Sequence, residues 1–302
     1  MRITIPPLEE RVAGAPISWG VSEVPGWGWQ YDAATVLRQM GDLGLAATEF
    51  GPEGFLPSRP EELVRTLAAY ELRAVGQFVP VVLHDGGHDP LPELRSTMDA
   101  LVAAGASTLV LAAATGQEGY DERPVLDDAG WDTLLRNLDR IAAAAAEAGL
   151  VATLHPHVGT MVESGADADR VLAGSGIGLC LDTGHLLIGG GDPVAVARSH
   201  PHRIAHVHLK DVRRDVADRV RSGELTYTEG VRAGMYVALG EGDVDVDAIV
   251  TTLEDEGYAG WYVLEQDTVL AGDPGGGGPV EDVRTSLYHL LGLAAQRSGV
   301  GI

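Results

Sequence analysis

Short apolar runs alternate along this chain with longer stretches whose apolar positions recur at helical spacing. Parallel strands that are buried on both faces give continuous apolar runs, and each needs a crossover helix to return to its sheet. Eight such pairs follow one another, with strand-like runs at 15–18, 45–50, 74–83, 108–113, 151–155, 177–182, 204–209 and 261–265 and helical stretches at 33–43, 61–70, 91–104, 131–148, 167–172, 193–198, 246–256 and 280–295. The pattern predicts an α/β fold, a single (β/α)8 TIM barrel that forms one domain over 1–302.

The connection between the seventh and eighth runs is longer than the others. Its surplus, 211–242, is rich in charge and contains Arg213, Arg214, Tyr227 and Tyr236. We expect a long loop, with a helix, on the mouth side of the barrel, where barrels carry lids and substrate contacts. A solvated charged helix without a function is the alternative.

Composition excludes some classes of partner. The chain has 44 acidic and 21 basic residues, and its formal net charge of -23 opposes attachment to a phosphate backbone. No apolar stretch approaches the length of a membrane span, and the first residues lack the apolar core of a signal peptide. We therefore expect a cytoplasmic protein without nucleic-acid or membrane partners. Cys180 is the only cysteine, which excludes an internal disulfide and a cysteine-based zinc cluster.

Metal-ligand residues close four successive runs: His155, Asp182, His208 and Glu265. Because active sites of barrels lie where the carboxyl ends of the strands meet, these side chains should converge at one mouth. A buried Asp182 would be costly unless a cation or several hydrogen bonds offset its charge. A set of imidazoles and carboxylates without thiolates suits Mn²⁺, Mg²⁺, Co²⁺ or Zn²⁺, so the sequence predicts one divalent metal site.

Further polar residues share the faces of these ligands. Residues two apart in a strand point the same way, so His206, His208 and Lys210 form one row, and His155 and His157 form another. A row of polar side chains that points into a barrel mouth can act as a reaction surface.

Other candidates at the mouth carry less information. Glu49 closes the second run and His84 the third, and each is either a contact for substrate hydroxyls or an ordinary polar loop residue. Trp19, Trp27 and Trp29 are candidate walls of a sugar pocket, because aromatic rings pack against the apolar faces of sugar rings. A place in the core is the alternative for at least one of them.

Several motifs together resemble the superfamily of xylose-isomerase-like sugar isomerases and epimerases. They are Leu181-Asp182-Thr183-Gly184-His185, His206-Val207-His208-Leu209-Lys210-Asp211, Leu239-Gly240-Glu241-Gly242-Asp243-Val244-Asp245 and Leu264-Glu265-Gln266-Asp267. More narrowly, the chain is similar to the inosose dehydratase branch at Ala15-Pro16-Ile17-Ser18-Trp19-Gly20, Pro25-Gly26-Trp27-Gly28, Thr48-Glu49-Phe50-Gly51-Pro52 and His155-Pro156-His157-Val158-Gly159-Thr160. The resemblance covers nearly the whole chain and implies a small polyol or keto-sugar as substrate.

The resemblance implies a metal held by strands five to eight, here by His155, Asp182, His208 and Glu265. Mn²⁺ or Co²⁺ is favoured, with Mg²⁺ and Zn²⁺ as alternatives. Many isomerases and epimerases of the superfamily carry Glu where this chain has His155, so His157 or Glu163 is an alternative fourth ligand. The loss of that carboxylate argues against epimerisation by two carboxylate bases and leaves room for dehydration.

For a dehydratase, the resemblance implies that the metal binds the ketone and a neighbouring hydroxyl and stabilises an enediolate. Lys210 and His157 are the leading candidates for the proton transfers, and Glu265 is a base if its metal contact is loose. His185 resembles a position that hydrogen-bonds substrate in relatives. Arg214, or Arg213 in its place, matches a substrate contact of some epimerases.

We expect a metal-dependent lyase that eliminates water from an inosose or a related keto-sugar. The alternatives on the same site are a sugar isomerase or epimerase, whose product keeps the mass of the substrate, and a lyase that acts on a 3-keto-glycoside. An abasic-site endonuclease would need a basic groove and a larger zinc-ligand set, and a non-catalytic polyol-binding barrel would show no turnover. Because barrels of this kind often pair, a homo-oligomer is a further expectation.

Overall fold

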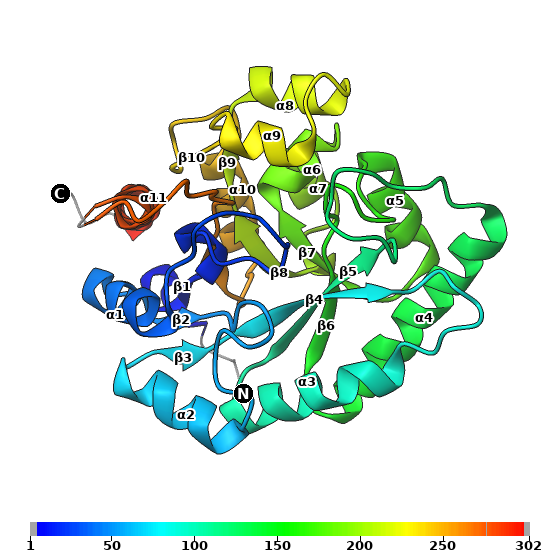
Figure 1. Cartoon of the computed structure of the whole chain (residues 1–302), viewed down its shortest axis with the longest axis horizontal. Helices are drawn as coiled ribbons and strands as arrows, with labels where there is room; N and C mark the ends of the chain where they lie inside the picture. Colours follow the sequence, from blue (N-terminus) through cyan, green and yellow to red (C-terminus); the bar gives the residue numbers. More distant parts are fainter. Residues whose placement is uncertain (1–4, 276, 299–302) are drawn as a thin grey trace.

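Parallel strands surround the centre of the molecule, and helices cover their outer side (Figure 1). The computed structural model describes residues 5–275 and 277–298. The main sheet has nine strands in the order β3-β2-β1-β11-β8-β7-β6-β5-β4, all paired in parallel. They are β1 (Val12–Gly14), β2 (Ala47–Thr48), β3 (Arg73–Ala74), β4 (Gly76–Val82), β5 (Thr108–Ala114), β6 (Val151–Leu154), β7 (Gly178–Asp182), β8 (Ile204–Leu209) and β11 (Tyr262–Leu264). This arrangement confirms the predicted α/β barrel.

The third barrel strand is divided at Val75 into β3 and β4. The amide of Val75 donates to Thr48 O at 3.1 Å, and its carbonyl accepts from the amides of Ser107 and Thr108, each at 3.1 Å. Val75 therefore joins both neighbours and completes the ring. One further bond, Phe50 N to Gly76 O at 3.0 Å, ties the chain after β2 to the start of β4. Among the described residues, the rest of β4 pairs only with β5.

The helices occupy nearly the predicted ranges, except that α6 (Thr183–Ile188) was not predicted. They are α1 (Ala33–Leu43), α2 (Pro60–Ala69), α3 (Leu91–Ala104), α4 (Asp128–Glu147), α5 (Gly165–Gly174), α6 (Thr183–Ile188), α7 (Pro193–Ser199), α10 (Val246–Asp255) and α11 (Pro279–Ser298), with 3₁₀ turns η1 (Leu8–Arg11), η2 (Pro16–Trp19) and η3 (Pro201–Arg203). Side chains cap several of them; Asp32 accepts from Thr35 N, and Ser164 and Asp167 form a reciprocal capping box on α5.

The predicted first strand at 15–18 is wrong. The strand is β1, Val12–Gly14, and Pro16 opens the 3₁₀ turn η2 directly after it. A proline has no amide hydrogen to give to a sheet, and its fixed φ suits the first turn of a helix. The short apolar run that suggested a strand is therefore the turn that follows one.

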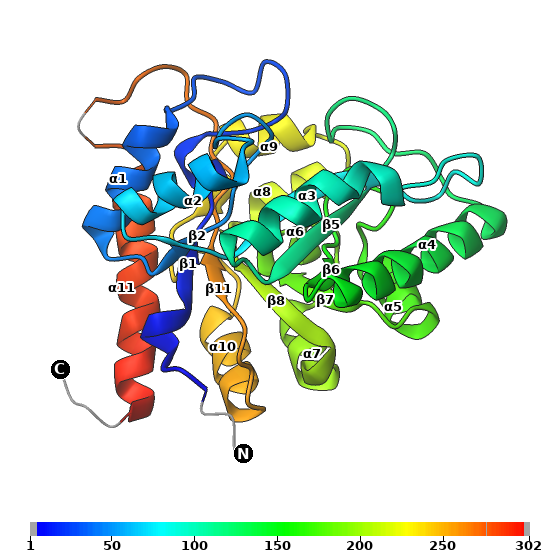
Figure 2. The same ribbon diagram turned by 90° about the horizontal axis from the view of Figure 1, so that it is seen from below.

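The segment 211–242 is more structured than the long loop with one helix that the sequence predicts. It contains β9 (Asp211–Val212), α8 (Arg214–Arg221), α9 (Tyr227–Arg232) and β10 (Tyr236–Val237), and β9 and β10 pair antiparallel. In Figure 2, α9 lies at the same end of the barrel as the loop that precedes α1. The rings of Trp27 and Tyr227, 6.5 Å apart, connect these two segments.

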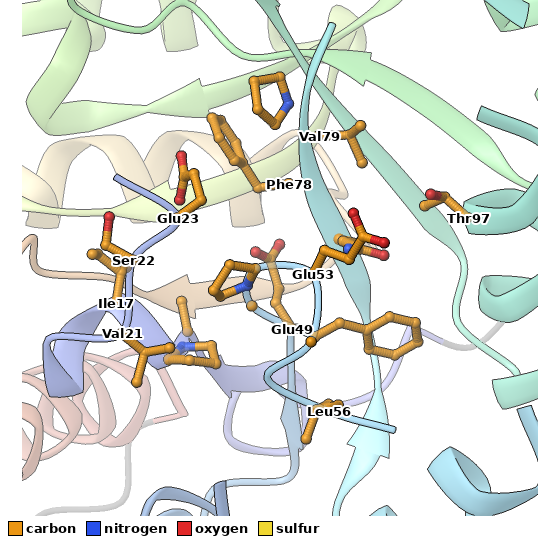
Figure 3. A pocket seen from close by; sticks show the side chains of 18 of the residues that line it. Ile17, Val21, Ser22, Glu23, Glu49, Glu53, Leu56, Phe78, Val79 and Thr97 are labelled. Carbon is orange, nitrogen blue, oxygen red and sulfur yellow. The ribbon is translucent and has the colours of Figure 1, made fainter. Parts of the chain in front are cut away.

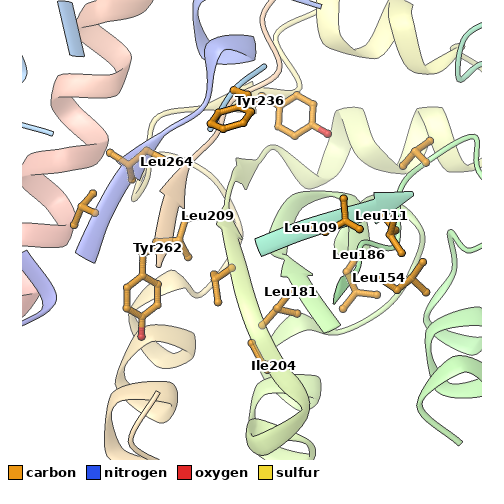
Figure 4. Close-up of a cluster of buried hydrophobic side chains, with 14 of the residues drawn as sticks. Leu109, Leu111, Leu154, Leu181, Leu186, Ile204, Leu209, Tyr236, Tyr262 and Leu264 are labelled. Carbon is orange, nitrogen blue, oxygen red and sulfur yellow. The ribbon is translucent and has the colours of Figure 1, made fainter. Parts of the chain in front are cut away.

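Aliphatic side chains of neighbouring strands alternate with the mouth residues along each strand and so point to the opposite face of the sheet, toward the helices. Figure 4 shows Leu109 and Leu111 of β5 near Leu154 and Leu181, while Leu209 and Leu264 continue the cluster on the other side. Each of these side chains is at most 2% exposed. Within the described part of the chain, no helix has both the length and the apolar character needed to cross a membrane.

Candidate metal centre and active site

Four side chains that the sequence singles out meet at the carboxyl ends of β6, β7, β8 and β11. They are His155, Asp182, His208 and Glu265, and their possible ligand atoms all lie within 4.8 Å of one another. His155 Nε2 is 3.2 Å from Asp182 Oδ2. His208 Nδ1 is 3.7 Å from Asp182 Oδ2 and 3.1 Å from Glu265 Oε2. The other oxygen of Asp182 accepts the amide of His185 at 2.7 Å and thereby starts α6, which fixes the carboxylate.

Glu49 orients the imidazole of His208. Its Oε1 lies 3.0 Å from His208 Nε2 and 2.8 Å from His206 Nε2. Burial opposes the charge of Glu49, but His208 and His206 hold the pKa of this carboxyl well below its usual range, so the carboxylate accepts both bonds. In a neutral His208 ring, Nδ1 therefore carries the lone pair and faces Asp182 and Glu265. A carboxylate behind the ring is a common support of metal-ligating histidines.

The charges of this region fit a divalent cation. Asp182, Glu265 and Asp267 place three carboxylates around one ammonium, that of Lys210, and Glu49 adds a fourth carboxylate behind His208. Burial raises the pKa of Glu265, against the opposite influence of His208 and Lys210. The buried Nδ1 of His208 has no hydrogen-bond partner. An excess of carboxylates and an unpartnered buried nitrogen are what a site for a hard or borderline divalent ion requires.

Lys210, the only lysine of the chain, is buried inside this group of acids. Its Nζ is 2.7 Å from Glu265 Oε1 and 3.5 Å from Asp182 Oδ2, and it donates to Asp267 Oδ1. Burial opposes the charge, but Asp182, Asp267 and Glu265 raise the pKa of Lys210 well above its usual value. Lys210 is therefore an ammonium, a source of positive charge and of a proton, and not a free base.

Neighbouring residues hold the backbone of Lys210. Thr183 Oγ1 donates to Lys210 O at 2.6 Å and accepts from Lys210 N at 2.9 Å. A Cβ on Gly184 would lie 2.7 Å from Lys210 Cβ and 3.0 Å from a ring carbon of Tyr236. Only glycine permits this approach of α6 to the lysine, which explains the residue between Thr183 and His185.

A second cluster comprises His157, His185 and Asp267, whose possible ligand atoms also lie within 4.8 Å of one another. His157 Nδ1 donates to Val158 O at 2.7 Å, so Nε2 of this ring carries the lone pair. His185 Nδ1 accepts from Val158 N at 3.3 Å, so in the neutral ring Nε2 carries the proton, 3.6 Å from Asp267 Oδ2. A protonated nitrogen does not bind a metal, and this cluster therefore suits proton transfer and hydrogen bonding better than a second ion.

Both rings of this cluster are neutral near pH 7. Burial, together with His185, His155 and Lys210, holds the pKa of His157 well below its usual value. Burial and Lys210 lower the pKa of His185 to about 4. His157 thus offers an unprotonated nitrogen with a free lone pair, whereas His185 offers a hydrogen-bond donor.

A cavity of about 550 Å³ opens beside these groups. His157, Glu265, Asp267, Tyr227 and Tyr120 line one part of it. The rings of Tyr120 and His157 lie 4.3 Å apart, and Gly159 makes this contact possible, because a Cβ there would lie 2.1 Å from Tyr120 O. Figure 3 shows Glu49 among the side chains that line the cavity.

Four predicted substrate contacts occupy other positions. Trp19 is fully buried and donates from its indole to Gln39 Oε1 at 2.6 Å, because η2 turns it into the core. Arg214 is the first residue of α8, and its side chain is exposed. The side chain of its alternative, Arg213, which precedes the helix, is exposed as well. His84 does not line the cavity. His206 is fully buried and bound to Glu49, one layer below the mouth. None of the four lines the cavity, and their roles as substrate contacts stay predictions.

The structure also narrows the choice of a fourth ligand. Glu163 Oε2 accepts the amide of Gly159 at 2.7 Å and lies 3.5 Å from Arg123 Nε, so it braces the loop after β6. His157 belongs to the second cluster. Of the three alternatives, only His155 joins Asp182, His208 and Glu265.

Asp267, Tyr227 and Tyr236 are site residues that the sequence reasoning passed over. Asp267 bonds to Lys210 through one oxygen and accepts from the Tyr227 hydroxyl through the other. The hydroxyls of Tyr227 and Tyr236 are 3.0 Å apart, and the Tyr236 ring lies 5.3 Å from Lys210 Nζ. The position of Asp267, two residues after Glu265, was a usable signal for a shared face.

Comparisons with known proteins agree with this architecture. A family model described as xylose isomerase-like TIM barrel matches residues 37–288. An inosose dehydratase of Geobacillus kaustophilus (strain HTA426) is 33% identical over 90% of this chain and 92% of its own length. The rhizopine catabolism protein MocC of Rhizobium meliloti is 32% identical over 94% of this chain and 89% of its own length.

Among solved structures, the IolI protein with a bound zinc atom superposes with a TM-score of 0.70 at 15% identity and covers 95% of this chain and 98% of its own. That likeness concerns the fold. The match of the family model over most of the sequence and the curated relatives show that the chain belongs to the xylose isomerase-like TIM barrel family.

Proposed function

We propose that this protein is a metal-dependent dehydratase that eliminates water from an inosose or a related keto-sugar. The observation that carries the proposal is the placement of His157, whose Nε2 carries a free lone pair, beside a group of possible metal ligands and a buried Lys210 ammonium. The names of the relatives support the class of reaction, since several at about 30% identity are inosose dehydratases.

His155, Asp182, His208 and Glu265 would hold the ion. A divalent ion at this position polarises a substrate carbonyl and makes the neighbouring C–H bond more acidic. Imidazole and carboxylate ligands accept several ions; we favour Mn²⁺ or Co²⁺. His185 Nε2–H points toward Asp267 at the edge of the cavity, where it can donate to a substrate hydroxyl.

His157 would act as the base. Its Nε2 takes the proton from the hydroxyl-bearing carbon next to the ketone, and the electron pair of that C–H bond forms the enolate double bond. When the enolate collapses, the C–O bond to the β-hydroxyl breaks and the oxygen leaves as water with a proton from the acid side. Lys210 is the candidate source of that proton, through Asp267 and the Tyr227 hydroxyl that lines the cavity.

The geometry disfavours the isomerase or epimerase alternative. Epimerisation by two bases needs a second carboxylate on strand five, where this chain has His155, and Glu163 is bound to Gly159 instead. Elimination needs one base and one acid, and His157 and Lys210 fill these roles with the protonation states described above.

Mass spectrometry of protein loaded with Mn²⁺ and incubated with keto-inositols and keto-sugars tests the proposal. We expect a product lighter by one water from at least one keto-inositol. A product of unchanged mass with altered retention would establish an isomerase or epimerase. No turnover with any of the four metals would contradict an enzymatic role.

A further inference from the structure

The cavity extends well beyond the metal-ligand group. Its lining runs from Glu265 and Asp267, past the chain after β2, to Ser96, Thr97 and Ala100 of α3. These two ends belong to opposite sides of the barrel wall. The cavity therefore passes through the wall and does not stop at the mouth.

The division of the third strand creates this passage. After the Phe50–Gly76 bond, β4 turns away from the chain after β2, and among the described residues it pairs only with β5. The gap lies between the loop 50–58 on one side and β4 with α3 on the other. We call this part of the cavity the side lobe and define it by Phe50, Leu56, Leu63, Val79, Thr97 and Ala100.

The side lobe is apolar where it joins the rest of the cavity and polar at its outer end. Figure 3 shows Phe78 and Val79 on opposite faces of β4, with Thr97 on the side of Val79 and Leu56 on the loop 50–58. Glu53 and Glu93 have exposed side chains near the outer end. Leu56 and Leu63 are buried, at 8% and 2% exposure, so the apolar wall is a formed surface.

The volume exceeds the needs of an unsubstituted ring. Cavities of roughly 300–1,000 Å³ hold drug-sized ligands, and this one measures about 550 Å³. An inosose has only a six-carbon ring and six oxygens, all polar at the rim, and it has no group that would occupy an apolar lobe. A larger ligand with one apolar part matches both the size and the distribution of polarity.

We propose that the side lobe binds an apolar substituent on the keto-polyol ring, so that the preferred substrates are ring ethers or glycosides with an alkyl or aryl group. This inference rests on the proposed function for the identity of the ring. The ring would lie against Glu265 and His157, and the substituent would lie between Leu56 and Val79. Elimination itself needs no additional residue, because the same base and acid serve a substituted ring.

Binding measurements without turnover test the side lobe. Calorimetry of Mn²⁺-loaded protein with methyl β-D-glucopyranoside and phenyl β-D-glucopyranoside compares two ligands that differ only in the substituent. We expect the phenyl compound to bind about tenfold more tightly, because its ring leaves water for an apolar wall. Equal affinities, or the absence of binding by both compounds, would overturn the proposal.

Two variants localise the effect. Ala100→Phe fills the lobe and should reduce the phenyl advantage to about twofold or less, with the methyl compound unaffected. Val102→Phe introduces the same side chain on α3 at an exposed position and should keep the advantage. If Ala100→Phe does not fold, Val79→Trp is a second variant that fills the side lobe. If a folded variant with a filled lobe still binds the phenyl compound more tightly, the proposal is contradicted. A change of oligomeric state in Ala100→Phe also contradicts it, because it would assign the lobe to a contact between copies of the chain.

The outcome separates the two proposals. Dehydration of an inosose without any phenyl preference leaves the proposed function standing and removes the side lobe from it. A phenyl preference without dehydration of any keto-inositol supports the side lobe as a binding site and removes the proposed function.

Discussion

Oε1 of Glu49 lies 3.0 Å from Nε2 of His208, so that the opposite nitrogen of the ring faces Asp182 and Glu265. Residues 159 positions apart in the chain are thereby joined at the centre of the barrel. Sequence reasoning placed Glu49 at the mouth as a substrate contact. The structure adds a different role, because a ring fixed from behind presents its lone pair in one direction.

Glu49→Gln tests this support. The amide can still accept a hydrogen bond but lacks the charge that two imidazoles share, so we expect metal affinity to fall about 10- to 100-fold. Metal titration followed by elemental analysis measures it. Glu53→Gln is the matched control, since Glu53 also lines the cavity but is exposed. Equal losses in both variants would deny Glu49 a specific role.

Removal of the metal should lower the thermal stability. An ion present at about a hundredfold over its Kd contributes about 2.7 kcal/mol to the folded state. Treatment with a chelator should therefore lower the Tm by several degrees, and Mn²⁺ should restore it.

Asp182→Asn tests whether the effect of Mn²⁺ on the Tm depends on the predicted metal site. Asparagine retains an oxygen for the His185 amide, so α6 keeps its cap while the cation loses a charged ligand. We expect a folded protein whose Tm no longer responds to Mn²⁺. An undiminished response would place the ion elsewhere.

His157→Asn should separate proton removal from metal binding. Loss of a positioned base lowers kcat by about 10²- to 10⁴-fold, while the metal content should match the wild type. Exchange of the substrate carbon-bound proton in D₂O, followed by NMR, should disappear. Tyr120→Phe keeps the ring beside His157 and is the control for packing. Exchange at the wild-type rate in His157→Asn would assign the base to another group.

Lys210→Met should affect stability as well as activity. Removal of the ammonium leaves Asp182, Glu265 and Asp267 without their shared partner, and breaking a buried ion pair in this way costs about 3 kcal/mol or more. Urea unfolding measures the loss. Lys210→Arg keeps the charge and should recover part of the stability but little activity, because a guanidinium is larger than the ammonium that Asp182, Glu265 and Asp267 surround.

Asp167 provides a pH dependence away from the active site. Burial raises the pKa of Asp167, but its bonds to Ser164 and the charge of Arg123 outweigh that effect and lower it below the usual value. The group therefore contributes stability above about pH 4, and this contribution is lost as the pH falls through the lower folded-state pKa.

Asp167→Asn should lower the unfolding free energy by about 1 kcal/mol at neutral pH, as the loss of a helix cap does. Urea unfolding at a series of pH values should show the difference from wild type shrinking in acid. A difference independent of pH would mean that the charge of Asp167 contributes nothing.

The sequence was sufficient for the barrel and for the grouping of the four metal-ligand residues. Both follow from local rules, since apolar runs define buried strands and parallel strands present their carboxyl ends at one edge. Their role as ligands stays a prediction. The contribution of Tyr227 depended on how the segment 211–242 folds back, which no local period describes, whereas Asp267 stands two residues after Glu265 and had a local signal.

The positions of Trp19 and Arg214 also depend on more than local sequence patterns. An indole after a strand is compatible with a pocket wall or with the core, and only the direction of η2 decides in favour of the core. For Arg214 the spacing from His208 was suggestive, but α8 starts there and directs the side chain to solvent. The division of β3 from β4 likewise depends on tertiary pairing.

The burial of the only lysine has a practical consequence. Lys210 is 1% exposed and engaged by three carboxylates, so an amine-reactive dye finds no lysine side chain on the folded protein. Covalent tagging of that position therefore reports opening of the barrel centre. The time course of tagging under mild denaturation, read by peptide mapping, would follow the integrity of the mouth of the barrel without any substrate.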